Sequence, residues 1–144
     1  MRAPYTQLYL HCVWAIWDRL PLLTPEVEEV LLAAIHAKCR DLECELQALG
    51  GMPDHLHLLV RFPTTLSVAD LVKGVKGSSS HLLTQHVAKG TFFKWQGGYG
   101  AFTVSPDIIP TIRSYIHNQK RHHAEKNLWA DWEQTMQSED PPSE

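Results

Sequence analysis

The feature that most constrains the fold is an apolar segment that carries two histidines, Met-Pro-Asp-His-Leu-His-Leu-Leu-Val at residues 52–60. In an extended strand, side chains alternate between the two faces, so His55 and His57 point the same way. The opposite face is apolar and suits a core: Leu56, Leu58 and Val60. The segment therefore predicts a buried strand that holds two imidazoles side by side, which is the beginning of a divalent metal site. Two surface histidines facing solvent are the alternative interpretation.

The rest of the chain contains hydrophobic patterns of both periods, two and 3.6. They predict strands at 5–17, 43–49, 55–61 and 101–104, and helices at 25–42, 68–87 and 107–127. The resulting order, β-α-β-β-α-β followed by a helix, is typical of a ferredoxin-like fold. We therefore expect an α+β protein with an antiparallel sheet, the first two helices on one face of that sheet, and an additional C-terminal helix.

The same periodicities assign side chains to faces. On the first strand one face is expected to hold Leu8, Leu10, Cys12, Trp14 and Ile16, and on the second strand Cys44, Leu46 and Ala48. The third helix has a core stripe of Ile109, Ile112 and Ile116. On an adjacent stripe Tyr115 and Gln119 are four residues apart and hence neighbours. Gly74 and Gly77 inside the second helix suggest a close approach of another backbone.

Length and composition indicate one domain at residues 1–127, followed by an acidic, flexible tail at 128–144. No apolar run approaches the roughly 20 residues that span a bilayer, and no secretory signal pattern is present. The three cysteines form no Cys-x-x-Cys pair and suit buried free thiols in a reducing cytoplasm. We therefore expect a cytoplasmic protein without a membrane partner.

Charge is distributed unevenly along the chain. Residues 1–60 carry four Lys/Arg and eight Asp/Glu, residues 61–126 carry nine and three, and residues 127–144 carry none and five. A basic middle suggests a polyanionic partner, although a solvated mixed surface is an equal alternative. The candidate DNA-binding residues are Lys73, Lys76, Lys94, Trp95, Arg113, Lys120 and Arg121. Aromatic residues interleaved with cations at 88–100 suit unstacked bases as well as they suit a packed loop.

Three segments together resemble a known family. They are Met-Pro-Asp-His-Leu-His-Leu-Leu at 52–59, Gly-Tyr-Gly-Ala-Phe-Thr-Val-Ser at 98–105 and Tyr-Ile-His-Asn-Gln at 115–119. The chain is similar over about residues 5–125 to the single-tyrosine HUH transposases of insertion sequences that move as single-stranded DNA. The related REP-associated tyrosine transposases share this resemblance, although the basic terminal motif of some of them is absent here.

The resemblance implies a role for four residues. Tyr115 would be the nucleophile, and His55, His57 and Gln119 would hold Mg²⁺ or Mn²⁺. It further implies a homodimer that acts, in the nucleoid, on hairpin DNA with flanking single strands and leaves a 5′-phosphotyrosine and a free 3′-hydroxyl. Transesterification of this kind conserves the bond energy, and the sequence has no Walker loop, so no nucleotide cofactor is expected.

Elementary chemistry supports the same reading. Imidazole and amide ligands with open positions suit an ion that must also bind phosphate oxygens. A tyrosine, whose ordinary pKa is about 10, needs a metal or a base nearby in order to attack. Two alternatives stay open: a domesticated copy that binds hairpin nucleic acid without transposing, and a structural zinc site.

Several points stay open at the level of sequence. These are the hairpin and target sequences, an accessory protein, and whether the tyrosine acts within its own subunit. Four histidines have no assigned role: His11, His117, His122 and His123. His11 lies off the core face of the first strand and could approach the site, although a hydrogen-bonded sheet histidine is the stronger interpretation.

Overall fold

The computed structural model describes residues 4–86, 93–118 and 133–135. A four-stranded antiparallel sheet has the order β2-β3-β1-β4. The elements are β1 (Tyr9–Ala15), α1 (Pro25–Asp41), β2 (Glu45–Met52), β3 (His55–Arg61), α2 (Val68–His86), β4 (Gly100–Val104) and α3 (Ile109–His117), with 3-10 turns at Trp17–Arg19 and Pro106–Ile108. The predicted α+β class and ferredoxin-like order are confirmed.

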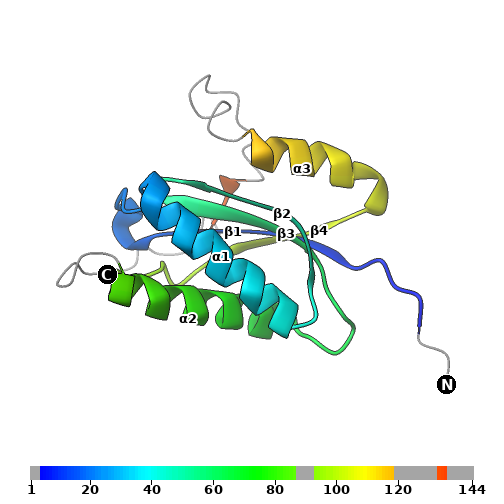
Figure 1. Ribbon diagram of the computed structural model, residues 1–144. Coiled ribbons are helices and arrows are strands. Elements are labelled where there is room, and N and C mark those ends of the chain that lie inside the picture. Colours follow the sequence, from blue (N-terminus) through cyan, green and yellow to red (C-terminus); the bar gives the residue numbers. More distant parts are fainter. Residues whose placement is uncertain (1–3, 87–92, 119–132, 136–144) are drawn as a thin grey trace.

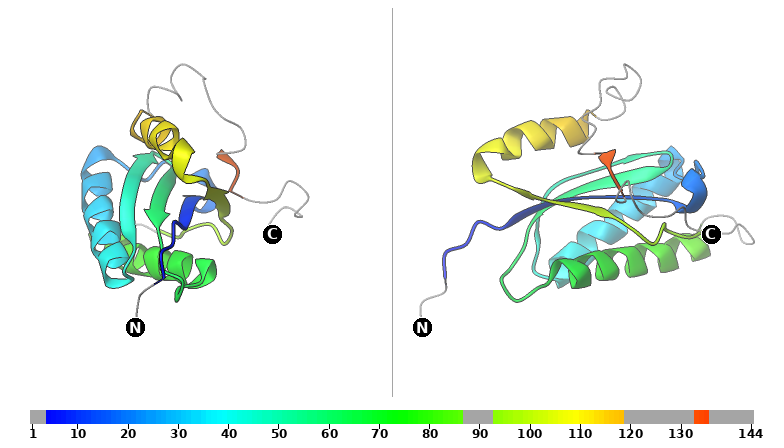
Figure 2. Two further views of the ribbon diagram at one scale, coloured as in Figure 1. Left: turned by 90° about the vertical axis from the view of Figure 1, so that its right-hand side faces the viewer. Right: turned by 180° about the vertical axis from the view of Figure 1, so that it is seen from behind.

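The sheet lies between two helical layers. Helices α1 and α2 cover one face, and α3 covers the other, as the end-on view makes plain (Figures 1 and 2). Both faces of β3 are therefore buried, which explains why its burial is continuous from His55 to Val60 although its sequence alternates. Helix α1 begins as predicted, because Oγ1 of Thr24 accepts a hydrogen bond from the Val27 amide and Pro25 occupies the first turn.

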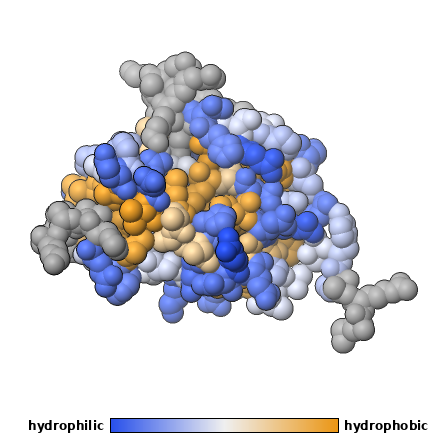
Figure 3. Space-filling view, in the orientation of Figure 1, coloured by the Kyte–Doolittle hydropathy of each residue, from blue (hydrophilic) through white to orange (hydrophobic). Residues whose placement is uncertain are grey.

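The larger core lies between the sheet and the α1–α2 layer. Alternate residues of β1 and β3 point into it, among them Leu10, Cys12, Trp14, Leu56 and Leu58. The three cysteines are free and buried, as predicted, and burial raises the pKa of the Cys12 thiol to about 12. Apolar residues also gather on the outer surface of this helical layer, where polar residues surround them (Figure 3).

A second, smaller core lies between the sheet and α3. It contains the predicted helix stripe of Ile109, Ile112 and Ile116, together with Ala48 of β2 and Leu59 of β3. Ala48 was expected to share a face with Leu46, and this expectation was wrong. The β2–β3 register shifts between Leu46 and Ala48, so a β-bulge turns Ala48 toward α3 while Leu46 packs on the larger core.

Several predicted boundaries differ from the structure. Strand β1 is Tyr9–Ala15, whereas alternation in the sequence runs from residue 5 to 17. Strand β2 is Glu45–Met52, so it continues through the two glycines that were expected to form a turn after residue 49. Helix α3 is preceded by a 3-10 turn, and beyond Asn118 the expected helix to residue 127 lies outside the described residues. Within the described part of the chain, no helix is both long enough and apolar enough to cross a membrane.

Candidate metal and tyrosine site

The two histidines of β3 lie on the α3 face of the sheet. His55 is opposite Ala15 and His57 opposite Val13 in the antiparallel register with β1. Their exposed fractions are 3% and 0%, so the alternative of two solvent-facing surface histidines is wrong. Burial of two imidazoles on a rigid central strand requires partners for their ring nitrogens. Those partners define the site.

The two Nε2 atoms converge on one carboxylate. Nε2 of His57 lies 2.6 Å from Oε2 of Glu133, and Nε2 of His55 lies 3.4 Å from Oε1. One ligand atom from each of these three residues lies within 4.8 Å of the others, which is a spacing that could hold a metal ion. Two imidazoles and a carboxylate form a donor set that suits divalent ions such as Mn²⁺. The residues present therefore fit the metal that the sequence resemblance implies.

On the Nδ1 side of the His55 ring lie a carboxylate and, beyond it, a cation. Its Nδ1 lies 2.7 Å from Oδ1 of Asp54, and Oδ2 of Asp54 lies 3.2 Å from Nε of Arg19. Burial alone would lower the pKa of His55, but hydrogen bonds with Asp54 and Glu133 outweigh it and raise that pKa. Burial likewise opposes ionisation of Glu133, yet the two histidines hold the pKa of its carboxyl below the ordinary range.

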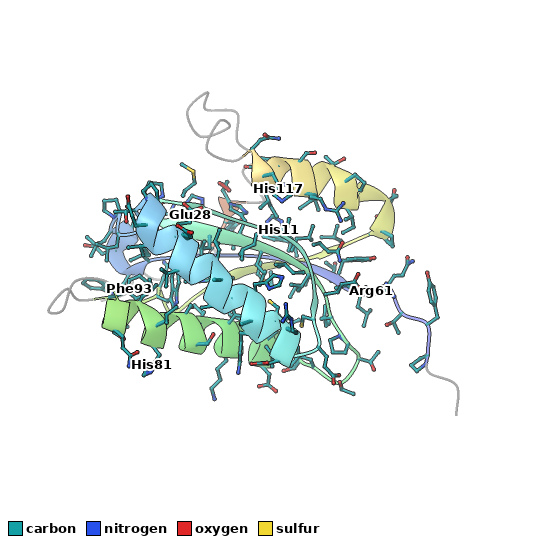
Figure 4. The ribbon with its side chains drawn as sticks, in the orientation of Figure 1. His11, Glu28, Arg61, His81, Phe93 and His117 are labelled. Atoms are coloured by element: carbon teal, nitrogen blue, oxygen red, sulfur yellow. The ribbon has the colours of Figure 1, made fainter. Side chains whose placement is uncertain are left out.

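A third histidine, His11, lies on the Nδ1 side of the His57 ring. Nε2 of His11, on β1, lies 2.9 Å from Nδ1 of His57, and both side chains are fully buried. His11 lies at the level of the sheet beneath α3 (Figure 4), and its ring also approaches Phe102 of β4 with centroids 5.8 Å apart. Burial, reinforced by the neighbouring His57, lowers the pKa of His11 to about 3, so its ring is neutral at physiological pH.

Helix α3 brings Tyr115 to the histidines. The helix is held on the sheet by its isoleucine stripe, and Tyr115 on the neighbouring stripe is 4% exposed. Its ring centroid lies 6.0 Å from that of His57 in an edge-on arrangement. Thus the predicted nucleophile and the two predicted histidine ligands, which come from α3 and β3, share one small buried region.

Some predicted residues fall outside what the structure describes. These are Gln119, Lys120 and Arg121, together with His122 and His123, which had no assigned role. The described part of the C-terminal region instead supplies Glu133, which the sequence analysis missed. Glu133 belongs to no motif and lies in the segment expected to be a tail. The only sequence signal was an acidic residue in a stretch without Lys or Arg.

The candidate DNA-binding residues divide into two groups. Lys73 on α2 and Lys94 are exposed. Lys76 donates from Nζ to the carbonyls of Gln96 and Gly98, at 2.6 and 3.1 Å, while its Nζ lies 5.8 Å from the Tyr99 ring centroid. Desolvation lowers the pKa of Lys76 to about 8.

The other two side chains also make contacts within the protein. Trp95 is buried against Trp14 and donates from Nε1 to Oγ of Ser79 over 3.0 Å. Arg113 donates to the carbonyl and the amide oxygen of Gln47 at 3.2 and 2.8 Å. The loop that contains Trp95 is therefore packed at this residue, and a DNA contact by Lys76, Trp95 or Arg113 stays a prediction.

The ferredoxin-like sheet and the placement of Tyr115 beside the histidine pair agree with the class of protein that the sequence resemblance implies, the single-tyrosine transposases. Residues 4–119 match the family described as "Transposase IS200 like". The chain belongs to this family, which consists of DNA-cleaving transposases.

Individual relatives agree with this assignment. The ISDra2 transposase TnpA of Deinococcus radiodurans is 28% identical over 120 residues, which covers 78% of this chain and 84% of the relative. A crystal structure from the same organism, described as a candidate transposase, superimposes with a TM-score of 0.68 at 29% identity over 83% of this chain and 95% of the other. A REP-associated tyrosine transposase bound to a REP hairpin has a TM-score of 0.64 at 20% identity, with 85% and 73% coverage, and shows the shared fold.

Proposed function

We propose that this transposase cuts and rejoins single-stranded DNA beside a hairpin by transesterification on Tyr115. The phenolic oxygen forms a bond to phosphorus and its proton passes to solvent. The bond between phosphorus and the 3′ oxygen breaks, and that oxygen takes up a proton. The products are a 5′-phosphotyrosine and a free 3′-hydroxyl. The observation that carries this proposal is the placement of Tyr115 against His57, 6.0 Å between ring centroids, beside two converging imidazoles.

We propose Mg²⁺ or Mn²⁺ as the cofactor, held by His55 and His57. Gln119 is the third ligand that the resemblance implies, and Glu133 is the third ligand that the geometry supports. When bound, a divalent ion supplies polarisation of the scissile phosphate and offsets its developing negative charge. A neutral Gln amide and a Glu carboxylate differ by one unit of charge, so the choice between them affects how readily an anionic phosphate is accepted.

The chain's own residues supply position and exclusion of water. The rigid strand β3 holds both imidazoles, and the α3 stripe anchors the tyrosine helix over them. Because Tyr115 is buried, few water molecules can compete for its phosphoester, which favours rejoining over hydrolysis. This property is what a strand-transfer reaction requires.

The proposed substrate is hairpin DNA with a flanking single strand. The basic stretch at 61–126 and the exposed Lys73 and Lys94 support a DNA contact. A homodimer, as the sequence resemblance implies, is part of the same proposal, as is a catalytic domain at 1–127.

Covalent capture of DNA tests this proposal. The protein is incubated with labelled single-stranded DNA from the flanks of its own gene, with Mn²⁺ or with EDTA, and run on a denaturing gel. We expect a metal-dependent protein–DNA band that Tyr115→Phe abolishes while hairpin binding on a native gel persists. His117→Phe, at the exposed end of α3, is the matched control and should keep the band. Hairpin binding without any covalent band would instead support a domesticated binding protein.

A further inference from the structure

The Nδ1 atoms of His55 and His57 have partners of different chemistry. Each imidazole directs Nε2 toward Glu133 and Nδ1 toward a partner on the other side of the ring. For His55 that partner is the carboxylate of Asp54, which accepts a hydrogen bond. For His57 it is another imidazole, His11, at 2.9 Å. A neutral imidazole has one N–H and one lone pair, so the direction of the hydrogen bond between the two rings must be decided.

If His57 binds a metal ion, the position of its single ring proton decides the direction of the hydrogen bond with His11. If Nε2 of His57 is to present a lone pair to an ion, its proton must reside on Nδ1. Nδ1–H then donates to Nε2 of His11, which must accept, and the proton of His11 resides on its own Nδ1. The opposite direction would place a proton on Nε2 of His57 and abolish its ability to ligate.

The fold holds His11 in position for this contact. His11 is paired with Leu59 of β3 on one side and with Phe102 of β4 on the other, so its backbone is inside the sheet. Its ring stacks with that of His57 at 5.2 Å between centroids and 26° between planes. With no exposed surface, the ring cannot turn to solvent for another partner.

The chemistry of the acceptor also matters. Asp54 is an anion, whereas a neutral imidazole accepts the same hydrogen bond without adding negative charge beside an anionic phosphate. One carboxylate and one imidazole therefore orient two ligands while limiting the negative charge of the site.

We propose that His11 is a positioning residue that accepts a hydrogen bond from Nδ1 of His57 and thereby supports the tautomer whose Nε2 lone pair faces the metal. This inference rests on the proposed function for the presence of the ion. Without an ion, Nε2 of His57 lies 2.6 Å from the Glu133 carboxylate, which can only accept, so that nitrogen carries the proton until an ion takes its place.

The first test is the tautomer of His57 by ¹⁵N–¹H correlation of histidine ring nitrogens in wild-type protein at neutral pH, without metal and with saturating Mg²⁺, which is diamagnetic. Signals of His57 are assigned from their loss in His57→Gln. We expect a proton on Nε2 of His57, facing Glu133, in the metal-free protein, and a protonated Nδ1 with an unprotonated Nε2 when Mg²⁺ is bound. A proton that remains on Nε2 of His57 in the Mg²⁺-bound protein would overturn the inference.

The second test is the Mn²⁺ dissociation constant, measured by electron paramagnetic resonance on folded variants without DNA. We expect His11→Phe, which keeps a ring but has no acceptor, to bind Mn²⁺ about 10- to 100-fold more weakly. His11→Gln places an amide oxygen near the position of Nε2 and should restore most of the affinity. His36→Gln, an exposed histidine of α1, is the control and should match the wild type.

The outcomes separate the two proposals. Wild-type affinity in folded His11→Phe, or equal weakness of His11→Gln and His11→Phe, would overturn the role of His11 as acceptor. Absence of Mn²⁺ binding by the wild-type protein would instead remove the metal from the proposed function and, with it, the role of His11 toward that metal.

Discussion

At the scale of single residues, neighbours along a strand have unrelated tasks because they face opposite layers. Cys12 is a buried thiol in the larger core, whereas the adjacent His11 hydrogen-bonds His57 on the α3 side. Alternation of this kind lets β1 and β3 contribute to the core and to the site with the same few residues. This arrangement buries the titratable ring of His11, which makes the free energy of unfolding depend on pH.

We expect His11 to make the metal-free protein sensitive to acid. Its folded-state pKa, about 3, is below its ordinary value of 6.5, so the unfolded chain binds the proton first as the pH falls. Stability is therefore lost below pH 6.5, by about 2 kcal/mol at pH 5. Urea unfolding in EDTA at pH 7 and pH 5 should show that His11→Gln, which does not titrate, lacks this loss. An equal loss in both proteins would contradict the assignment.

At the scale of elements, the C-terminal segment 133–135 meets the sheet at the edge strand β4. A Cβ on Gly100 would overlap the backbone carbonyl oxygen of Gln134 and approach Cγ1 of Val13 to 2.9 Å. Oγ1 of Thr135 also donates to Oε1 of Gln96 over 3.2 Å. A glycine on β4 thus provides the space in which Glu133 reaches the histidines.

Gly100→Ala should consequently displace this segment and destabilise the protein by about 1–3 kcal/mol, the usual range for overpacking. Part of that loss comes from withdrawing Glu133, so the effect should be smaller in a Glu133→Gln background. Chemical denaturation of the four proteins of this double-mutant cycle measures the coupling. Gly97→Ala is the control, because a Cβ there has no neighbour within 4 Å. Strict additivity of the Gly100 and Glu133 changes would refute the link.

Helix α2 offers a matched pair of glycines. A Cβ on Gly77 would meet nothing within 4 Å, whereas on Gly74 it would lie 3.3 Å from Cδ1 of Leu42 and from Cε of Lys38. Gly77→Ala should therefore stabilise the protein by about 1 kcal/mol, the full difference in helix propensity. Gly74→Ala should give a smaller gain or a loss, because the α1–α2 contact must adjust. Thermal unfolding of both variants tests this order, and a larger gain for Gly74→Ala would reverse it.

At the scale of the whole molecule, the net charge of −3 includes a basic stretch at 61–126 between two acidic ones. Among the described residues of the basic stretch 61–126, Lys73 and Lys94 are exposed, whereas Nζ of Lys76 donates to backbone carbonyls. Only exposed cations can neutralise phosphates at little cost, because Lys76 would have to leave its internal hydrogen bonds.

We expect the double variant Lys73→Ala/Lys94→Ala to bind hairpin DNA more weakly and to reduce the slope of log affinity against log salt by about 2, one per phosphate contact. Titrations by fluorescence anisotropy at several salt concentrations measure both. Arg40→Ala, an exposed cation in the acidic N-terminal part, should leave the slope unchanged. An unaltered slope in the double variant would mean that these lysines do not face the DNA.

The sequence by itself determined the order of elements, the faces of β1 and β3, the pairing of His55 with His57 and the α3 stripe, because these follow from local periods of 2 and 3.6 residues. Only the tertiary structure decided the bulge that turns Ala48 to α3, the contact between His11 and His57, and the approach of Glu133. Those features depend on strand register and on packing between segments distant in the chain. No local pattern encodes them, since many registers and chain paths are compatible with the same periodicity.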